Sequence, residues 1–400
     1  MGYGVSCLVV ATRDMKHYIH FEIFIYKIMK HMHPFRFAVT ALFSYILVFS
    51  SCDPSPDGPT DTFDRGAMLQ NFADNLIRPA YNDLNNRTLV FHTAITTFNS
   101  APTIENLDAM QAAWQDAYYQ WQFANAFNFG PAGEEGLQKS LIEEIGTFPA
   151  SVVKLEANLH SGTWNVADFN RDARGFPAIE YLIFGLAASD AAIVDSFLTA
   201  PHHKAYLTAL ADNLKSRIET VTNAWNGTYY TEFINNKGTD VGSSTSHLYN
   251  EFVRSFEAAK NFKLGLPLGK RPGQTQTEPQ LVEAVYSGKS LECLRLHLTA
   301  IENIWYGRSK SGQDGIGFRE YLEKVEGGPA LITSTETQLA ALRAALAAVS
   351  DTPTLSEQIT AGNPQLETLY TDFQKMTRYF KSDLSSLLGI AITFSSGDGD

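Results

Sequence analysis

The chain is poor in cysteine and in charged residues. Its 400 residues include three cysteines, Cys7, Cys52 and Cys293, and only 18% of the residues are Asp, Glu, Lys or Arg. The formal net charge is −12, and no block rich in Lys and Arg occurs along the chain. A protein that binds nucleic acid needs a basic face to displace the counterions of the phosphates. We therefore exclude nucleic acid as a partner.

Common catalytic motifs are also absent. There is no HExxH, which supplies two zinc ligands and a base to many metallopeptidases, and no P-loop, GxSxG or CxxC. Six histidines follow residue 52, and none lies four residues from another. Neither a nucleophile with its base nor a closed set of metal ligands can be recognised from local spacing.

The first 51 residues have the pattern of a bacterial lipoprotein signal peptide. A short basic region at 29–36 precedes the apolar stretch 37–49, and small residues then lead to Cys52. The stretch is too short for a typical spanning helix, so we predict cleavage before a lipidated Cys52, with translation starting at Met29 or Met32. An uncleaved membrane anchor over 17–50 is the alternative, but Lys and His residues interrupt it.

Processing at Cys52 has consequences for the mature chain. Residues 1–51 hold five Lys or Arg and two Asp or Glu, so the net charge becomes −12 − 3 = −15. Residues 52–63 are rich in Pro, Gly and Asp and are expected to form a flexible tether. Cys293 would be the one unmodified thiol, which leaves no pair for an intramolecular disulfide.

The mature chain has the periodicity of an all-α protein. Apolar residues recur at helical spacing along most of it, and Pro79 is expected to kink or divide the first helix. The only alternating, strand-like stretch is 390–394. The predicted helices cover residues 68–98, 103–127, 141–145, 152–159, 177–185, 191–224 (one helix, or two separated at 201–203), 246–262, 290–306, 336–348 and 366–388.

A weak internal repeat divides the chain into two parts. Residues 99–107 resemble 286–294, and Gly175 with Glu180-Tyr181-Leu182 is echoed by Gly315 with Glu320-Tyr321-Leu322 at the same spacing. These matches favour two related helical bundles with a cleft between them. We place the bundles at 64–240 and 241–400.

Glu180 is a lone carboxylate in an apolar segment, RGFPAIEYLIFG, at 174–185. A buried charge without a partner is costly, so this carboxylate should be paired, protonated or bound to a cation. Pro177 suits the first position of a helix, which would place Glu180 in the first turn. We predict an ionised, structural Glu180 held by a basic side chain, with Arg174 and Arg254 as the candidates.

The segment 246–262 carries a polar stripe at helical spacing. Two interpretations are open: a solvated outer face, or a face turned towards an interface where Arg254 could pair with Glu180. The stripe consists of His247, Asn250, Arg254, Glu257 and Lys260.

Six segments, taken in order, resemble the imelysin-like proteins, which are bacterial envelope lipoproteins linked to iron uptake. The resemblance covers nearly the whole mature chain. The segments are 77–81, Trp114 with 127–131, 175–185, 263–269, 286–290, and 392–394 with 398–400.

The resemblance implies two helical bundles and a GxHxxE motif, proposed as a metal or substrate site near the bundle interface. Gly175 and Glu180 match this motif, but Pro177 stands where the family has His. Without the histidine, Glu180 is the single candidate metal ligand. A lone Glu is a poor site for iron or zinc. The residues predicted to form the binding site are Arg174, Gly175, Pro177, Glu180, Asn128, Arg254 and Glu257.

We expect a non-enzymatic binding lipoprotein that acts in iron or haem uptake, with iron or another divalent metal as a possible cofactor. A metallopeptidase of the imelysin type is one alternative, since some family members are named for proteolysis. A scaffold that no longer binds metal is the other. The expected location is the bacterial envelope, on the periplasmic face or the outer membrane. The expected partners are the membrane, through the lipid, and an outer-membrane transporter or other iron-uptake proteins.

Overall fold

The computed structural model describes residues 63–133 and 140–394. The predicted signal peptide, Cys52 and nearly all of the tether lie outside these residues, so their predictions remain open. The described residues from Phe63 onward belong to one compact unit, within which the predicted boundary at residue 240 stays a prediction.

The all-α prediction is confirmed: the described residues form helices and loops and include no β-strand. The α-helices are α3 (Arg65–Asn71), α4 (Arg78–Ser100), α5 (Ile104–Ala124), α7 (Leu141–Ile145), α8 (Val152–Ser161), α9 (Gly175–Glu180), α10 (Asp190–Thr199), α11 (His203–Asn226), α12 (Tyr229–Asn235), α13 (Ser244–Ala258), α14 (Ser290–Tyr306), α15 (Phe318–Glu323), α16 (Gly328–Ala348), α17 (Leu355–Thr360), α18 (Pro364–Thr377) and α19 (Leu384–Leu388).

Segments of π-helix interrupt or extend several of these helices. They are η4 (Phe72–Ile77), η8 (Tyr181–Gly185), η9 (Ala259–Gly265) and η11 (Arg378–Asp383). Segment η4 ends just before Pro79, whose ring would clash with the carbonyl four residues earlier in a regular helix. The widened turn therefore lets the chain pass Pro79 without a break, where the sequence predicted a kink or a division.

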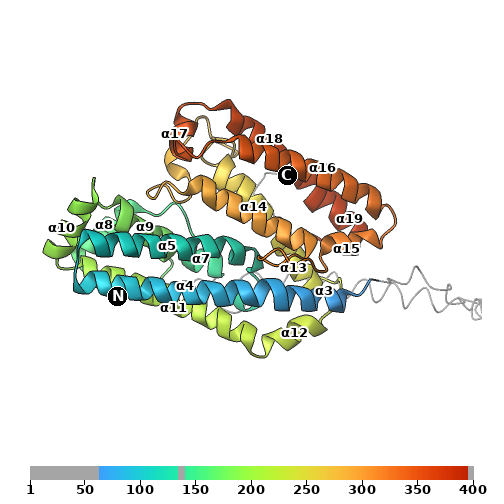
Figure 1. Ribbon diagram of the computed structural model, residues 1–400, viewed down its shortest axis with the longest axis horizontal. Helices are drawn as coiled ribbons and strands as arrows, with labels where there is room; N and C mark the ends of the chain where they lie inside the picture. The colour runs from blue at the N-terminus through green and yellow to red at the C-terminus, as the bar shows by residue number, and fades with distance from the viewer. Residues whose placement is uncertain (1–62, 134–139, 395–400) are drawn as a thin grey trace, which may run out of the picture. The chain divides into compact units, whose positions relative to one another are not determined.

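The first half is built on α4, α5 and α11, which lie side by side (Figure 1). Thr103 begins α5 as predicted, because its hydroxyl accepts a hydrogen bond from the N–H of Asn106 at 3.2 Å. The apolar faces meet in aromatic contacts, such as the edge-on pair of Phe98 and Phe197 and the pair of Tyr81 and Trp225.

The second half places α13 and α14 beside α16 and α18 (Figure 1). Its core holds a cluster of phenylalanine rings. Phe252 and Phe256 contact Phe380 of η11, and Phe373 contacts Phe256. Helix α5 also packs along α14, and α13 contacts the turn that follows α5. The residues of both halves thus share a continuous core, which places side chains from each half around common cavities.

Three predictions about elements were wrong. The stretch 390–394 is not a strand: Asn250 binds its backbone, donating to Ala391 O at 3.0 Å and accepting from Thr393 N at 2.7 Å. The stretch between the helices predicted at 191–224 and 246–262 was expected to be a polar connection but contains α12, and the helix predicted at 336–348 begins eight residues earlier, at Gly328. Short polar helices lack the apolar periodicity that reveals longer ones.

No single helix in the described part of the chain is long and apolar enough to cross a membrane. The bent pair 171–185 and 190–199, which meet at 103°, passes that test together by length and composition.

Candidate functional site

Helix α9 is set by a glycine in an unusual conformation. Gly175 has φ +73°, and a Cβ at this position would lie 2.5 Å from the carbonyl oxygen of Ile145. Both facts require glycine. The helix therefore begins at Gly175 and not at Pro177 as predicted, and Glu180 is its sixth residue.

Glu180 is buried at the end of α9, with 2% of its surface exposed. Its Oε1 accepts two hydrogen bonds from Ser287, one from the backbone N–H and one from the hydroxyl, each at 2.8 Å. Burial raises the pKa of this carboxyl from 4.5 to about 7, although the bonds from Ser287 pull it down. Burial thus favours the protonated form of Glu180.

The predicted basic partner of Glu180 is wrong. Arg174 Nη2 lies 3.0 Å from Glu144 Oε1, and its Nη1 donates to the carbonyls of Val166 and Asp168 at 2.7 Å. Arg254 lies 3.0 Å from Glu251. The carboxylate takes its hydrogen bonds from the loop ahead of α14, which sequence periodicity could not identify.

A cavity of about 220 Å³ lies beside Glu180. Pro177 and Glu180 both line it, together with apolar side chains that include Phe148, Val152 and Val282. A histidine at position 177 would share the helix face of Glu180, but proline offers no ligand atom there. The described residues contain no group of three His, Cys, Asp or Glu side chains placed to hold a metal ion, so they do not fit the metal site that the family motif implies.

The polar stripe of α13 faces a larger cavity, of about 910 Å³ (the α13 cavity). His247, Arg254 and Glu257 line it, and Asn128 and Phe394 come from other parts of the chain. The stripe therefore lines a cavity through these three residues, but Arg254 does not pair with Glu180 and its side chain is 48% exposed, so neither interpretation describes the whole stripe. Asn250 is used instead to bind residues 391–393, and Lys260 is buried outside the cavity wall.

Carboxylates dominate the charged lining of the α13 cavity. Glu257 Oε1 accepts from Lys381 at 3.0 Å, and Glu143 pairs with Arg171. Glu251 is buried next to Arg254, and burial raises its pKa to about 7 despite the arginine. Asn128 also closes the wall, because its Oδ1 accepts from the N–H of Ile142 at 3.0 Å.

A serine–histidine pair on the same wall was not predicted. Ser255 Oγ lies 2.6 Å from His297 Nε2, and both residues line the α13 cavity. Burial and nearby Lys263 hold the pKa of His297 well below its usual range, and His297 Nδ1 has no hydrogen-bond partner. The imidazole thus lacks the third group that would orient it and stabilise its protonated form, as a general base requires.

A buried ion pair of the second half is hydrogen-bonded to the first half through Tyr118. Lys263 Nζ lies 2.8 Å from Glu283 Oε2, and Tyr118 donates its hydroxyl hydrogen to Glu283 Oε1 at 2.8 Å. Ala284 follows with φ +52°, a conformation that a non-glycine residue seldom adopts. This turn lets one short segment direct Glu283 to Lys263 and Ser287 to Glu180.

Comparisons with known proteins agree with this architecture. Iron-regulated protein A of Synechococcus elongatus is 25% identical over 315 residues, which are 76% of this chain and 80% of that protein. The crystal structure of a candidate iron-regulated protein A precursor from Parabacteroides distasonis has a TM-score of 0.66 at 16% identity, covering 83% of this chain and 97% of that one. An imelysin-like protein from Psychrobacter arcticum has a TM-score of 0.62 at 20% identity, covering 82% and 97%.

The two crystal structures show that this chain shares their fold. Sequence identities of 16% and 20% support no finer statement. The sequence pattern of the imelysin family matches residues 77–379, which include α9, α13 and the residues that line both cavities except Thr393 and Phe394. This chain is a member of the imelysin family.

Proposed function

We propose that this protein is a non-enzymatic binding component of bacterial iron uptake, and that its ligand occupies the α13 cavity. The observation that carries the proposal is the stripe of His247, Arg254 and Glu257, which lines a cavity of about 910 Å³. Cavities of about 300–1,000 Å³ with a few convergent polar groups are typical of small-molecule sites. The name of the Synechococcus relative supports the link to iron.

The ligand we favour is iron held in an organic chelate or in haem. A bare ion needs several protein ligands, and the described residues bring no such group together. Glu180 offers one carboxylate whose Oε1 already accepts two hydrogen bonds. A chelated or porphyrin-bound iron instead needs volume and hydrogen-bonding side chains, which the α13 cavity supplies.

Calorimetric titration of the mature chain with ferric citrate, with haem and with ferrous ion alone tests the proposal. We expect saturable binding of a complexed form. Ala258 lines the α13 cavity, so Ala258→Phe should weaken binding at least about tenfold by filling it. Ala109→Phe, on the exposed face of α5, is the matched control and should bind normally. Absence of saturable binding for all three probes would reject the proposal.

Two alternatives remain testable beside it. Peptidase activity is favoured by the Ser255–His297 contact, but His297 is neither oriented by an acid nor able to hold a proton easily. Labelling of Ser255 by a fluorophosphonate would establish it as a nucleophile. A scaffold role would be supported by co-purification of a transporter with a chain that binds none of the iron probes.

Envelope anchoring through Cys52 is part of the same proposal. The basic segment, apolar stretch and small residues that precede Cys52 motivate it. Mass spectrometry of the envelope fraction should find an acylated Cys52 at the N-terminus of the mature chain. A dominant intact peptide that spans Ser51 and Cys52 would contradict it.

A further inference from the structure

A third cavity, of about 600 Å³, lies away from the residues of the α13 cavity. Helices α4 and α5 supply one side, and α14 with the loop 307–316 supplies the other. Leu76, Pro79, Ala80 and Phe123 are among its apolar lining residues, so an apolar ligand body would gain free energy by leaving water there. We call it the Lys310 cavity after the lysine at its edge.

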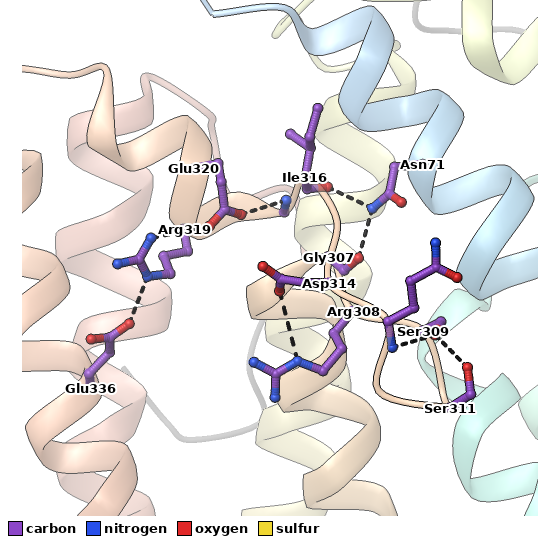
Figure 2. Close-up of polar contacts among 12 residues, drawn as sticks. Asn71, Gly307, Arg308, Ser309, Ser311, Asp314, Ile316, Arg319, Glu320 and Glu336 are labelled. Atoms are coloured by element: carbon purple, nitrogen blue, oxygen red, sulfur yellow. Dashed lines mark hydrogen bonds and ion pairs between the residues drawn. The ribbon is translucent and has the colours of Figure 1, made fainter.

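The loop 307–316 is held in a defined shape. Asn71, the last residue of α3, donates from Nδ2 to the carbonyls of Gly307 at 2.8 Å and Ile316 at 2.9 Å. One side chain therefore holds both ends of the loop (Figure 2). Within the loop, Ser309 N donates to Gln313 O at 2.9 Å. Side chains that project from this loop therefore have fixed starting points at the cavity.

The charged residues that line the cavity are two cations and one anion: Arg308, Lys310 and Asp83. Lys310 Nζ lies 3.1 Å from Asp83 and 4.8 Å from the centre of the Phe123 ring. Asp83 is also 3.1 Å from Arg87, so it is shared between two cations. The cavity wall thus carries a local positive excess in a chain whose net charge is −12.

Arg308 is less firmly paired than the buried Arg174. Its guanidinium lies 4.6 Å from the centre of the Tyr306 ring, and its Nε is 3.9 Å from Asp314 (Figure 2). A carboxylate at the cavity mouth could accept hydrogen bonds from Arg308 and Lys310 together, which are stronger than bonds between neutral groups. Asp83 would keep Arg87 as its partner when Lys310 turns to the ligand.

We propose that the Lys310 cavity binds a small amphipathic carboxylate, with its apolar body against Leu76, Ala80 and Phe123 and its head on Arg308 and Lys310. Charge complementarity selects an anion over a cation, and the apolar wall selects a chain or ring over a simple carboxylate such as acetate. Fatty acids and porphyrins share this chemistry. The inference does not depend on the α13 cavity or on the iron proposal.

Calorimetric titration of the mature chain tests the inference with four probes below their aggregation concentrations. Decanoate and mesoporphyrin represent the two sources of an amphipathic carboxylate, decyltrimethylammonium carries the same chain with the opposite charge, and acetate carries the head alone. We expect one of the first two to bind at one site at least about tenfold more tightly than the last two. Binding of neither carboxylate amphiphile, or equal binding of decyltrimethylammonium, would overturn the inference.

The double variant Arg308→Gln with Lys310→Gln locates the site. It should weaken binding about fivefold to tenfold, the effect expected for two partly exposed ion pairs. Lys324→Gln, an exposed lysine at the end of α15, is the control and should bind like the wild type. Since Arg308 and Lys310 are partly exposed, both variants should fold, which circular dichroism can verify. Unchanged affinity in the folded double variant would reject this assignment.

Discussion

Glu180 and Glu320 stand at the same distance after a glycine, at Gly175 and Gly315, and their carboxylates have opposite surroundings. Glu180 is buried at the end of α9 and accepts two bonds from Ser287, a residue 107 positions away. Glu320 keeps 29% of its side chain exposed and accepts from the N–H of Gly317, three residues before it, at 2.8 Å. One carboxylate joins distant segments, whereas the other caps its own helix.

The neighbouring charges differ in the same way. Arg319 lies 3.2 Å from Glu320 and 2.8 Å from Glu336, so Glu320 belongs to a surface ion-pair cluster (Figure 2). Glu180 needs no cation to hold it, because burial itself favours its protonated form. A shared sequence spacing therefore fixes neither the start of the helix, which is Gly175 in α9 and Phe318 in α15, nor the electrostatic environment of the carboxylate.

The largest effect we expect comes from the glycine before α9. Gly175→Ala adds a Cβ 2.5 Å from the Ile145 carbonyl oxygen, at φ +73°. It should lower the free energy of unfolding by about 2–5 kcal/mol, combining left-handed strain with overpacking. Gly312→Ala is the control, because Gly312 has φ +89° but nothing within 4 Å of the added Cβ. Strain alone should cost it about 1–2 kcal/mol.

Urea denaturation of both variants measures the difference. Equal losses of stability would mean that the close packing of Gly175 against Ile145 has no energetic consequence. In that event the position of α9 would not depend on this contact, and other contacts would have to keep Glu180 buried.

The next effect separates the two carboxylates by pH. The folded pKa of Glu180, about 7, exceeds the reference value of 4.5. Between these values the folded protein keeps a proton that the unfolded chain has released, so this group's stabilising contribution is full below pH 4.5 and is lost as pH rises through 7. Glu180→Gln should therefore raise stability at pH 8 by about 2–3 kcal/mol and change it little at pH 4.5.

Glu320→Gln should act in the opposite direction. It removes an ion pair with Arg319 on a partly exposed surface and should cost about 0.5–1 kcal/mol at pH 8. Thermal unfolding from pH 4.5 to pH 8 records both variants, and Glu251, whose pKa is also raised to about 7, keeps part of the pH dependence in each. A loss of stability in Glu180→Gln at pH 8 would show that the carboxylate is ionised and paired after all.

Local features of this fold were predictable because they depend on neighbouring residues. Thr103 caps α5, and α7 and α14 have the predicted bounds, since capping, periodicity and glycine or proline signals lie within one or two turns. The π-helical segments were not predicted, because they preserve the apolar character of a helix and change only its hydrogen-bond register.

The site depended on contacts between distant residues, and its prediction was correspondingly incomplete. The stripe on α13 was recognised, but a polar pattern looks the same whether it faces solvent or a polar cavity. Ser255 and His297 lie 42 positions apart, and Ser287 lies 107 from Glu180. No spacing rule connects such pairs, so their partners emerged only from the packing of α5, α13 and α14.

The last effect tests what Pro177 removed. Pro177 and Glu180 line the same 220 Å³ cavity, three residues apart on α9, so Pro177→His places an imidazole beside the carboxylate. Two ligands form an incomplete metal site, and water must supply the others, so we expect a modest gain of about tenfold in Zn²⁺ affinity over wild type. The gain should grow as pH rises through 7, because a ligating carboxylate must lose its proton. Titration calorimetry with Zn²⁺ measures it, with Pro177→Ala as the control for loss of proline. The double variant Pro177→His with Glu180→Gln should bind no better than wild type, and if it binds as tightly as Pro177→His, Glu180 is not a ligand.

Gly317 is the counterpart of Pro177, because it lies three residues before Glu320. The same substitution cannot be tested there, since a Cβ at Gly317 would lie 2.2 Å from the backbone nitrogen of Gly307. The two helix starts therefore differ in capacity as well as environment: only the one beside Glu180 has room for a ligand side chain.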